Sequence, residues 1–215
     1  MAVINEIEGR VLGSLVEKQL TTPEYYPLTL NALVAACNQK SNRDPVMSLD
    51  ATAVLAAIDT LRDKNLVYLF HGSTSRAVKY KHMLPSVYEV DEAGTAVITL
   101  LLLRGPQTVG ELRGRADRLH EFGSISEVQE TLDELARRDE PLVLKLERQP
   151  GQKEARFAHL LSGEVDMEKF RSRQEIDLSP AAGGKMHHLE AEVVRLSDEL
   201  QSLRSEFEQF KSQFS

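Results

Sequence analysis

The sequence predicts a mainly helical α+β protein in which a unit of three helices and a small β-hairpin occurs twice, followed by one long helical segment. Three observations predict this. Apolar residues recur at spacings of three and four in six segments, which is the helical period. A pair of short runs rich in strand-forming residues follows each set of three segments, and the last thirty or so residues carry a sustained heptad pattern.

The first unit is read from residues 4 to 82. A helical stripe from Ile4 to Val16 ends at Thr21-Thr22-Pro23, and a second helix covers Leu30 to Cys37. Asp50 is a candidate N-cap for a third helix. The buried stripe expected for that helix consists of Val54, Leu55, Ile58 and Leu61. The run Leu66–Phe70, a turn near Gly72 and a returning strand through Val78 and Tyr80 then predict a hairpin.

The second unit repeats this order. Helices are expected at residues 93–103, 109–116 and 125–135, and strands at 142–146 and 155–161. Tyr80-Lys81-His82 and Phe157-Ala158-His159 occupy matching positions in the two units. The order helix, helix, helix, hairpin is that of winged-helix domains, so we predict two of them, at residues 1–83 and 84–162.

The tail is predicted to form a coiled coil. Residues 163–184 have the composition of a linker, and apolar residues occupy the a and d heptad positions over 185–215. The residues expected at a dimer seam are Leu189, Val193, Leu196, Leu200, Leu203, Phe207 and Phe210. Three of the four g–e pairs would be opposite in charge in a parallel pair, which predicts a homodimer. The alternative is a helix that folds back on its own domains.

Composition and charge limit the function classes. The chain has 215 residues, one cysteine and a net charge of −7, and its N-terminus lacks the basic region of a signal peptide, so we expect a cytoplasmic protein that does not enter a membrane. The first 83 residues carry nine Lys/Arg against eight Asp/Glu, whereas the remainder is acidic. This weighs against DNA binding driven by phosphate contacts alone.

No catalytic chemistry is expected. The histidines and Cys37 lack metal-ligand spacing, and no phosphate-binding glycine loop, nucleophile elbow or zinc-protease motif occurs. Isolated histidines such as His82 and His159 are expected at the surface or in hairpins. We therefore expect no catalytic residue, no metal site and no cofactor.

One segment interrupts the repeat. The connection between the second and third helices of the first unit spans residues 38–49, is polar and carries Lys40 and Arg43. It is either a functional loop or a solvated connection without a partner.

Several stretches of the first half resemble one family. The runs INEIEGRVLG at residues 4–13, TTPEYYPLTLNAL at 21–33 and ACNQKSNRDPVM at 36–47 are similar to those of the YceH family of uncharacterised bacterial proteins, as is KYKH at 79–82. The resemblance covers the whole length. It implies tandem winged helices and a bacterial, cytosolic protein, and it implies no biochemical activity.

Two functions follow from this fold, and both stay open. The first is a DNA-associated regulator that contacts DNA through its first unit, because a basic face is conceivable there. The candidate nucleic-acid-binding residues are Lys40, Asn42, Arg43, Arg62, Arg76, Lys79 and Lys81. The second is a scaffold that binds other proteins, which the acidic third helix of the second unit favours. We rank the DNA-associated regulator slightly ahead.

Overall fold

The computed structural model describes residues 3–71, 77–148 and 154–163, and it confirms a mixed α+β protein of helices and small antiparallel sheets. The predicted linker and coiled-coil seam lie outside these residues. Within the described part, no helix is long and apolar enough to cross a membrane.

The first half contains α1 (Glu6–Thr21), the 3-10 turn η1 (Pro23–Tyr25), β1 (Leu28–Thr29), α2 (Leu30–Cys37), α3 (Ala51–Asp63), β2 (Val67–Phe70) and β3 (Lys79–His82). Its helices begin at side-chain caps. Asn5 and Glu8 form a capping box on α1, Thr29 caps α2 and, as predicted, Asp50 caps α3. The three strands form one antiparallel sheet in the order β1-β3-β2.

The second half contains α5 (Glu92–Arg104), α6 (Val109–Ala116), α7 (Ile125–Arg137), β4 (Val143–Lys145) and β5 (Phe157–His159). A short helix that the sequence pattern did not reveal, α4 (Leu84–Tyr88), connects the halves. Asp91, Thr108 and Ser124 cap the three longer helices. An isolated bridge between Gln107 and Phe157 takes the place that β1 has in the first half.

The strand registers of the two halves match. Val67 lies opposite His82 in the first hairpin and Val143 lies opposite His159 in the second. The equivalence of Tyr80-Lys81-His82 and Phe157-Ala158-His159, expected from the sequence, therefore holds at the level of backbone pairing.

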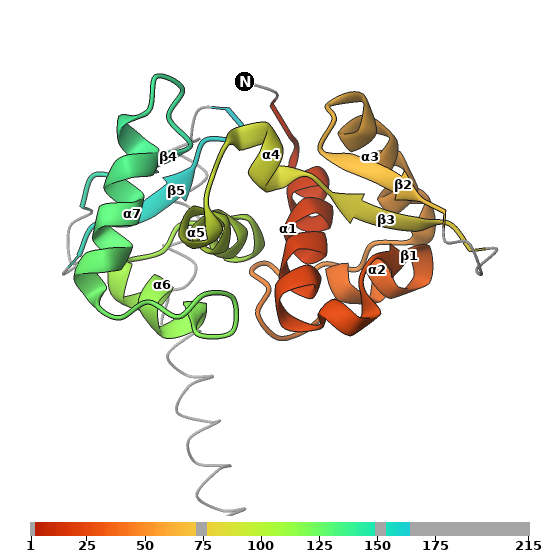
Figure 1. Cartoon of the computed structure of the whole chain (residues 1–215), viewed down its shortest axis with the longest axis horizontal. Helices are drawn as coiled ribbons and strands as arrows, with labels where there is room; N and C mark the ends of the chain where they lie inside the picture. Colours follow the sequence, from red (N-terminus) through yellow and green to blue (C-terminus); the bar gives the residue numbers. More distant parts are fainter. Residues whose placement is uncertain (1–2, 72–76, 149–153, 164–215) are drawn as a thin grey trace, which may run out of the picture. The chain divides into compact units, whose positions relative to one another are not determined.

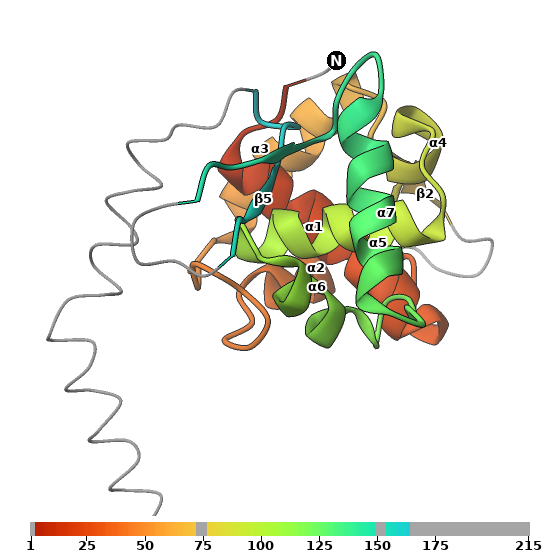
Figure 2. The same ribbon diagram turned by 90° about the vertical axis from the view of Figure 1, so that its left-hand side faces the viewer.

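The helices α1 and α5 lie side by side at the centre of the described residues (Figures 1 and 2). Both are buried along ten consecutive residues, Glu8–Glu17 and Gly94–Leu103. Gly13 allows the close approach, because a Cβ there would lie 3.0 Å from two side-chain carbons of Leu103.

The core does not divide at the predicted domain boundary. One cluster of buried apolar residues contains members of both halves, and residues 1–165 form one compact unit. The two halves therefore share one interior. The reason is that α1 and α5 each bury two opposite faces, one against their own half and one against the other helix.

One helix stripe also needs correction. The residues of α3 that are buried are Val54, Ala57, Ile58 and Leu61, whereas Leu55 is 38% exposed. Positions 54, 57, 58 and 61 follow the i, i+3, i+4, i+7 spacing of one helix face, and Leu55 lies to one side of it.

Candidate nucleic-acid interface

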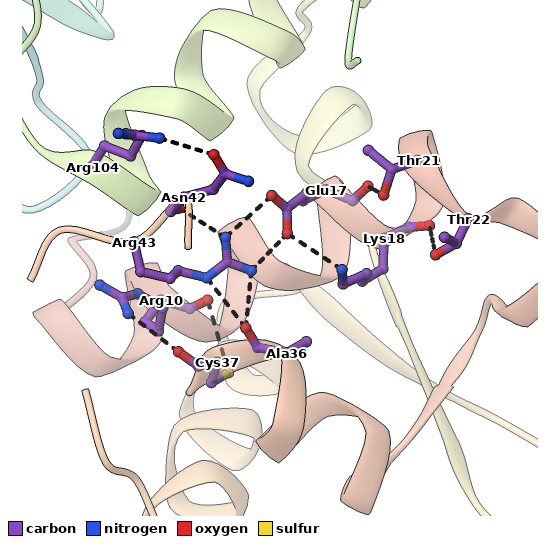
Figure 3. A network of polar contacts seen from close by, with 10 residues as sticks. All are labelled: Arg10, Glu17, Lys18, Thr21, Thr22, Ala36, Cys37, Asn42, Arg43 and Arg104. Carbon is purple, nitrogen blue, oxygen red and sulfur yellow. Dashed lines mark hydrogen bonds and ion pairs between the residues drawn. The ribbon is translucent and has the colours of Figure 1, made fainter. Parts of the chain in front are cut away.

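The polar connection between α2 and α3 is mainly a structural element. Arg43, predicted to contact nucleic acid, has a fully buried side chain that forms a two-pronged ion pair with Glu17 of α1. Its Nη1 and Nη2 donate to the two Glu17 oxygens at 3.1 and 2.6 Å, and its Nε donates to the Ala36 carbonyl at 3.2 Å (Figure 3). The prediction for Arg43 is corrected, because the side chain cannot reach a ligand while it holds α1 and α2 together.

The same connection joins the two halves. Arg104, the last residue of α5, donates to the Asn42 side-chain oxygen at 3.0 Å (Figure 3). The backbone N–H of Asp44 donates to the carbonyl of Leu103 at 2.9 Å. Asn42, a second predicted contact residue, is half-buried and is therefore part of this junction rather than an open surface.

Arg10 and Cys37 complete the buried polar network. The Arg10 guanidinium donates to the carbonyls of Cys37 and Pro45, at 3.2 and 2.6 Å. Burial lowers the Arg10 pKa and raises that of the Cys37 thiol. A buried thiol with a raised pKa stays protonated, which fits the structural role expected for this cysteine.

The exposed face of α3 offers few polar groups for reading bases. Arg62 is exposed near the C-terminal end of α3, and its guanidinium lies 3.3 Å from the carboxylate of Asp59. Two carboxylates, Asp59 and Asp63, are exposed beside Arg62, and the other exposed residues of α3 are small or apolar: Ala51, Thr52, Leu55, Ala56 and Thr60. Helix α3 is therefore poorly equipped for direct readout in a major groove.

The outer face of the β2–β3 hairpin is the strongest candidate site. Residues directly opposite each other in antiparallel strands share a face of the sheet, as do residues two apart along a strand. Tyr68 pairs with Lys81 and Phe70 pairs with Lys79, so these four residues share one face. We call this set, Tyr68, Phe70, Lys79 and Lys81, the hairpin outer face.

The hairpin outer face is open. Tyr68 is 50% exposed and Phe70 46%, Lys81 is exposed and Lys79 is half-buried. The opposite face of the hairpin carries Val67, Tyr80 and His82, which are buried in the core. In Figure 1, β2 and β3 lie on the side of the first half that points away from α5 and α7.

The second hairpin lacks this arrangement. The matching registers place Leu144 and Ala158 where the first hairpin has Tyr68 and Lys81. Leu146 and Arg156 stand at the positions of Phe70 and Lys79, and Leu146 and Ala158 are buried. Only the first of the two hairpins therefore combines exposed aromatic rings with lysines on one face.

Within the described residues, the lysines of the hairpin outer face differ from Arg156, the counterpart of Lys79, in having no acidic partner. Arg156 forms an ion pair with Glu111 at 2.7 Å, and Glu111 is the third residue after the α6 cap, Thr108. The third residue after the α2 cap, Thr29, is Ala32. Among the described residues, no carboxylate forms an ion pair with Lys79 or Lys81. These charges remain available to an anionic ligand.

The predicted contact residues are thus only partly brought together. Lys79 and Lys81 lie two residues apart on β3 and share a face of the sheet. Lys40 is exposed on the α2–α3 connection and shares no contact with them in the part of the chain that the structure describes. Arg76 lies outside the described residues.

Sequence reasoning missed Tyr68 and Phe70. The sequence shows that they alternate with Val67 and Leu69. That they share a face with Lys79 and Lys81 depends on the strand register, which the pattern alone does not give.

Each hairpin carries one histidine with a lowered pKa, His82 at the end of β3 and His159 at the end of β5. Burial, and then the nearby Lys81 cation, lower the pKa of His82 to about 4, and burial lowers that of His159 to about 4. Both histidines lie in hairpin strands, one of the two locations expected for them, and His82 is only 4% exposed. Over the described ranges, no three His, Cys, Asp or Glu side chains are grouped so that they could hold a metal ion.

Comparison with known proteins identifies relatives along the whole chain. Residues 4–152 match a family model described as "Protein of unknown function, DUF480". A UPF0502 protein from Citrifermentans bemidjiense is 53% identical over 192 residues, covering 89% of each chain. A UPF0502 protein from Geobacter sulfurreducens is 48% identical over 220 residues, covering 99% of this chain and 98% of its own.

Proposed function

Since the chain belongs to the DUF480/UPF0502 family of uncharacterised bacterial proteins, whose names state no activity, we propose its function from geometry: a non-enzymatic, cytoplasmic, DNA-associated regulator that contacts DNA through its first half. We also propose that, within this family, the chain is a YceH-type protein, as the runs at residues 4–13, 21–33 and 36–47 suggest. The observation that carries it is the hairpin outer face, with two exposed rings and two lysines that form no ion pair with any other described residue.

The element order supports a winged-helix assignment for each half. In the first half, helix, strand, helix, helix and hairpin follow in that order, and the hairpin joins β1 in one sheet. In the second half the same order recurs, with the Gln107 bridge in place of β1. Winged helices contact DNA through the third helix and the wing, and the wing here is the β2–β3 hairpin.

The charges favour contact through the wing over base reading by α3. Lysines on a hairpin bind phosphates, which position a protein on DNA without reading its sequence. Arg62 is the one exposed cation among the side chains of α3, and it is paired with Asp59, while the exposed Asp63 would repel phosphates. The second half contributes little, since Glu130 and Glu134 are exposed on α7.

A salt titration tests the proposal. A fluorescently labelled duplex of mixed sequence should bind the full chain at low salt, with an affinity that falls as salt rises. The variant Lys79→Glu/Lys81→Glu should bind more weakly and lower the log–log salt slope by about 2, since each lost phosphate contact removes roughly 0.9. Lys145→Glu, an exposed lysine of the second hairpin, is the matched control and should bind like the wild type.

Two results of this titration would contradict DNA contact through the first half. If no saturable binding occurs at low salt, or if Lys145→Glu weakens binding as much as the double variant, the proposal fails.

The alternative function is a protein-binding scaffold, and one observation favours it. Within the described residues β2 pairs only with β3, so its other edge is open, and Tyr68, Leu69 and Phe70 are all exposed there. An exposed apolar edge strand is a place where a partner protein can add a strand. Binding of a partner without any duplex binding would favour this function.

Homodimerisation through residues 185–215 is also proposed, and it rests on the heptad pattern alone. Sedimentation of the full chain and of a chain shortened after residue 184 tests it. The full chain should have the mass of a dimer and the shortened chain that of a monomer. A shortened chain that remains dimeric would contradict the coiled coil.

A further inference from the structure

We infer that the hairpin outer face binds a single-stranded stretch of nucleic acid, with bases stacked on Tyr68 and Phe70 and the backbone held by Lys79 and Lys81. This inference rests on the proposed function and narrows it, because it names the form of nucleic acid that the face accepts.

The spacing of the two rings suits an extended strand. Tyr68 and Phe70 are two residues apart on β2, which separates their Cα atoms by about 6.8 Å along the strand. Neighbouring nucleotides of a duplex strand rise by only about 3.4 Å. Two neighbouring bases can therefore lie on the two rings only if they are unstacked from one another, as they can be in a single strand.

The chemistry of the face fits the same ligand. Aromatic rings stack with the flat face of any base, and in a duplex those faces are covered by neighbouring base pairs. Each ring lies directly opposite a lysine, so a stacked base and a nearby phosphate could be bound at the same step along the hairpin. Two lysines alone supply little phosphate affinity to a chain with a net charge of −7, which leaves stacking as the larger contribution.

The internal repeat provides the contrast. At the positions of Tyr68 and Phe70 the second hairpin has Leu144 and Leu146, and at those of Lys81 and Lys79 it has Ala158 and the Glu111-paired Arg156. Two hairpins with the same register therefore differ in every side chain that the proposed ligand would touch. The hydrogen bond between the Tyr68 hydroxyl and Asn65, at 3.4 Å, leaves the ring itself exposed.

Binding measurements with two probes test the inference. The full chain is titrated into a labelled oligo-deoxythymidine and into a duplex of the same length, at low salt. The oligo-deoxythymidine should bind at least about tenfold more tightly. Tyr68→Ala/Phe70→Ala should weaken its binding by about tenfold or more per ring, and should leave duplex binding nearly unchanged.

A spectroscopic readout separates stacking from charge. The chain contains no tryptophan, so Tyr68→Trp introduces a single reporter, and Leu144→Trp places the matched reporter at the equivalent position of the second hairpin. Oligo-deoxythymidine should quench the fluorescence of Tyr68→Trp and leave that of Leu144→Trp unchanged. Circular dichroism of each variant verifies that it is folded.

The outcomes separate this inference from the proposed function. If the duplex binds as tightly as the single strand and Tyr68→Ala/Phe70→Ala binds both like the wild type, the inference is overturned and the proposed function stands. If neither probe binds at low salt, both fail. Equal quenching of the two tryptophan variants also overturns the inference.

Discussion

Arg43 shows how a single side chain can have a different role from the one that its residue type suggests. Arginine in a polar connection is typical of an anion-binding loop, but here the guanidinium is buried between α1 and α2 and is bonded to Glu17, Ala36 and Asn42. A charge in that position is stable only with all of its partners present. The side chain therefore contributes to folding, and the half-buried Lys79 and the exposed Lys81 carry the surface charge of the candidate site.

The first prediction concerns this ion pair. Glu17→Gln should lower the free energy of unfolding by about 3–5 kcal/mol, because it leaves the Arg43 charge buried without its counter-ion. Urea unfolding measures the change. Asp59→Asn, which removes the acidic partner of the exposed Arg62, is the matched control and should cost less than about 1 kcal/mol. Equal effects of the two substitutions would contradict the structural role of Arg43.

The second prediction concerns His82. The Nδ1 atom of its ring accepts a hydrogen bond from the backbone N–H of Leu84 at 3.3 Å, and its buried Nε2 has no partner among the described residues. Its pKa of about 4 in the folded protein is below the ordinary value of 6.5, so the unfolded chain binds the proton more readily. Stability is therefore full above about pH 6.5 and falls as the pH drops toward 4.

The size of this effect can be measured between pH 7 and pH 5. His82 alone should lower the free energy of unfolding by about 2 kcal/mol over that range. The lowered pKa values of Glu8 and Glu111 act mainly below pH 4.5, outside this window. His159, whose pKa burial also lowers to about 4, acts over the same range, so His82→Asn should remove about half of the dependence on pH and leave the rest. An unaltered slope in His82→Asn would show that another group titrates.

At the scale of elements, the sequence predicted the positions of helices and hairpins well, and it predicted which of their side chains are exposed less well. The bounds of α2 and α6 agree with the apolar period, and the predicted cap at Asp50 marks the start of α3. The two-residue β1 and the five-residue α4 are too short to produce a periodic signal. The composition of the hairpin outer face is set by the strand register, which the local pattern does not give. Arg43 is buried because it pairs with Glu17, 26 residues away in the sequence, and a local pattern cannot reveal such a partner.

The third prediction concerns the packing of α1 against α5. Gly13→Val should destabilise the protein by about 1–3 kcal/mol, because its side chain would overlap Leu102 and Leu103. A Cβ at Gly114 of α6 would meet no atom within 4 Å, so Gly114→Val is the matched control and should be neutral or mildly stabilising. Thermal unfolding measures both. Similar melting temperatures for the two variants would contradict close packing at Gly13.

At the scale of the whole molecule, the two halves form one core around α1 and α5. Backbone bonds join them at both ends, from Ile4 to the carbonyl of Leu161 and from Asp44 to that of Leu103. The repeated units are therefore halves of one body. The outer face of the first hairpin exposes Tyr68 and Phe70, whereas Leu146 and Ala158 at matching positions of the second hairpin are buried. This asymmetry is what directs the functional proposal to the first half.

The fourth prediction follows from the shared core. Residues 1–165 should unfold in one transition, with the same midpoint by circular dichroism and by calorimetry. Residues 1–83 alone should fail to fold stably, because the α1 face around Gly9 and Gly13 would lose the cover of Leu102 and Leu103. Two separate transitions, or a stable fragment of residues 1–83, would support independent domains instead.

The most direct test of the central claim is a map of the amide signals that shift in a nuclear magnetic resonance spectrum when oligo-deoxythymidine is added to the protein. The account predicts that the largest shifts fall on Val67–Phe70 and Lys79–His82, with little change on Val143–Lys145 and Phe157–His159. Shifts centred on the second hairpin or on α7, or no shifts at all, would contradict nucleic-acid binding at the hairpin outer face.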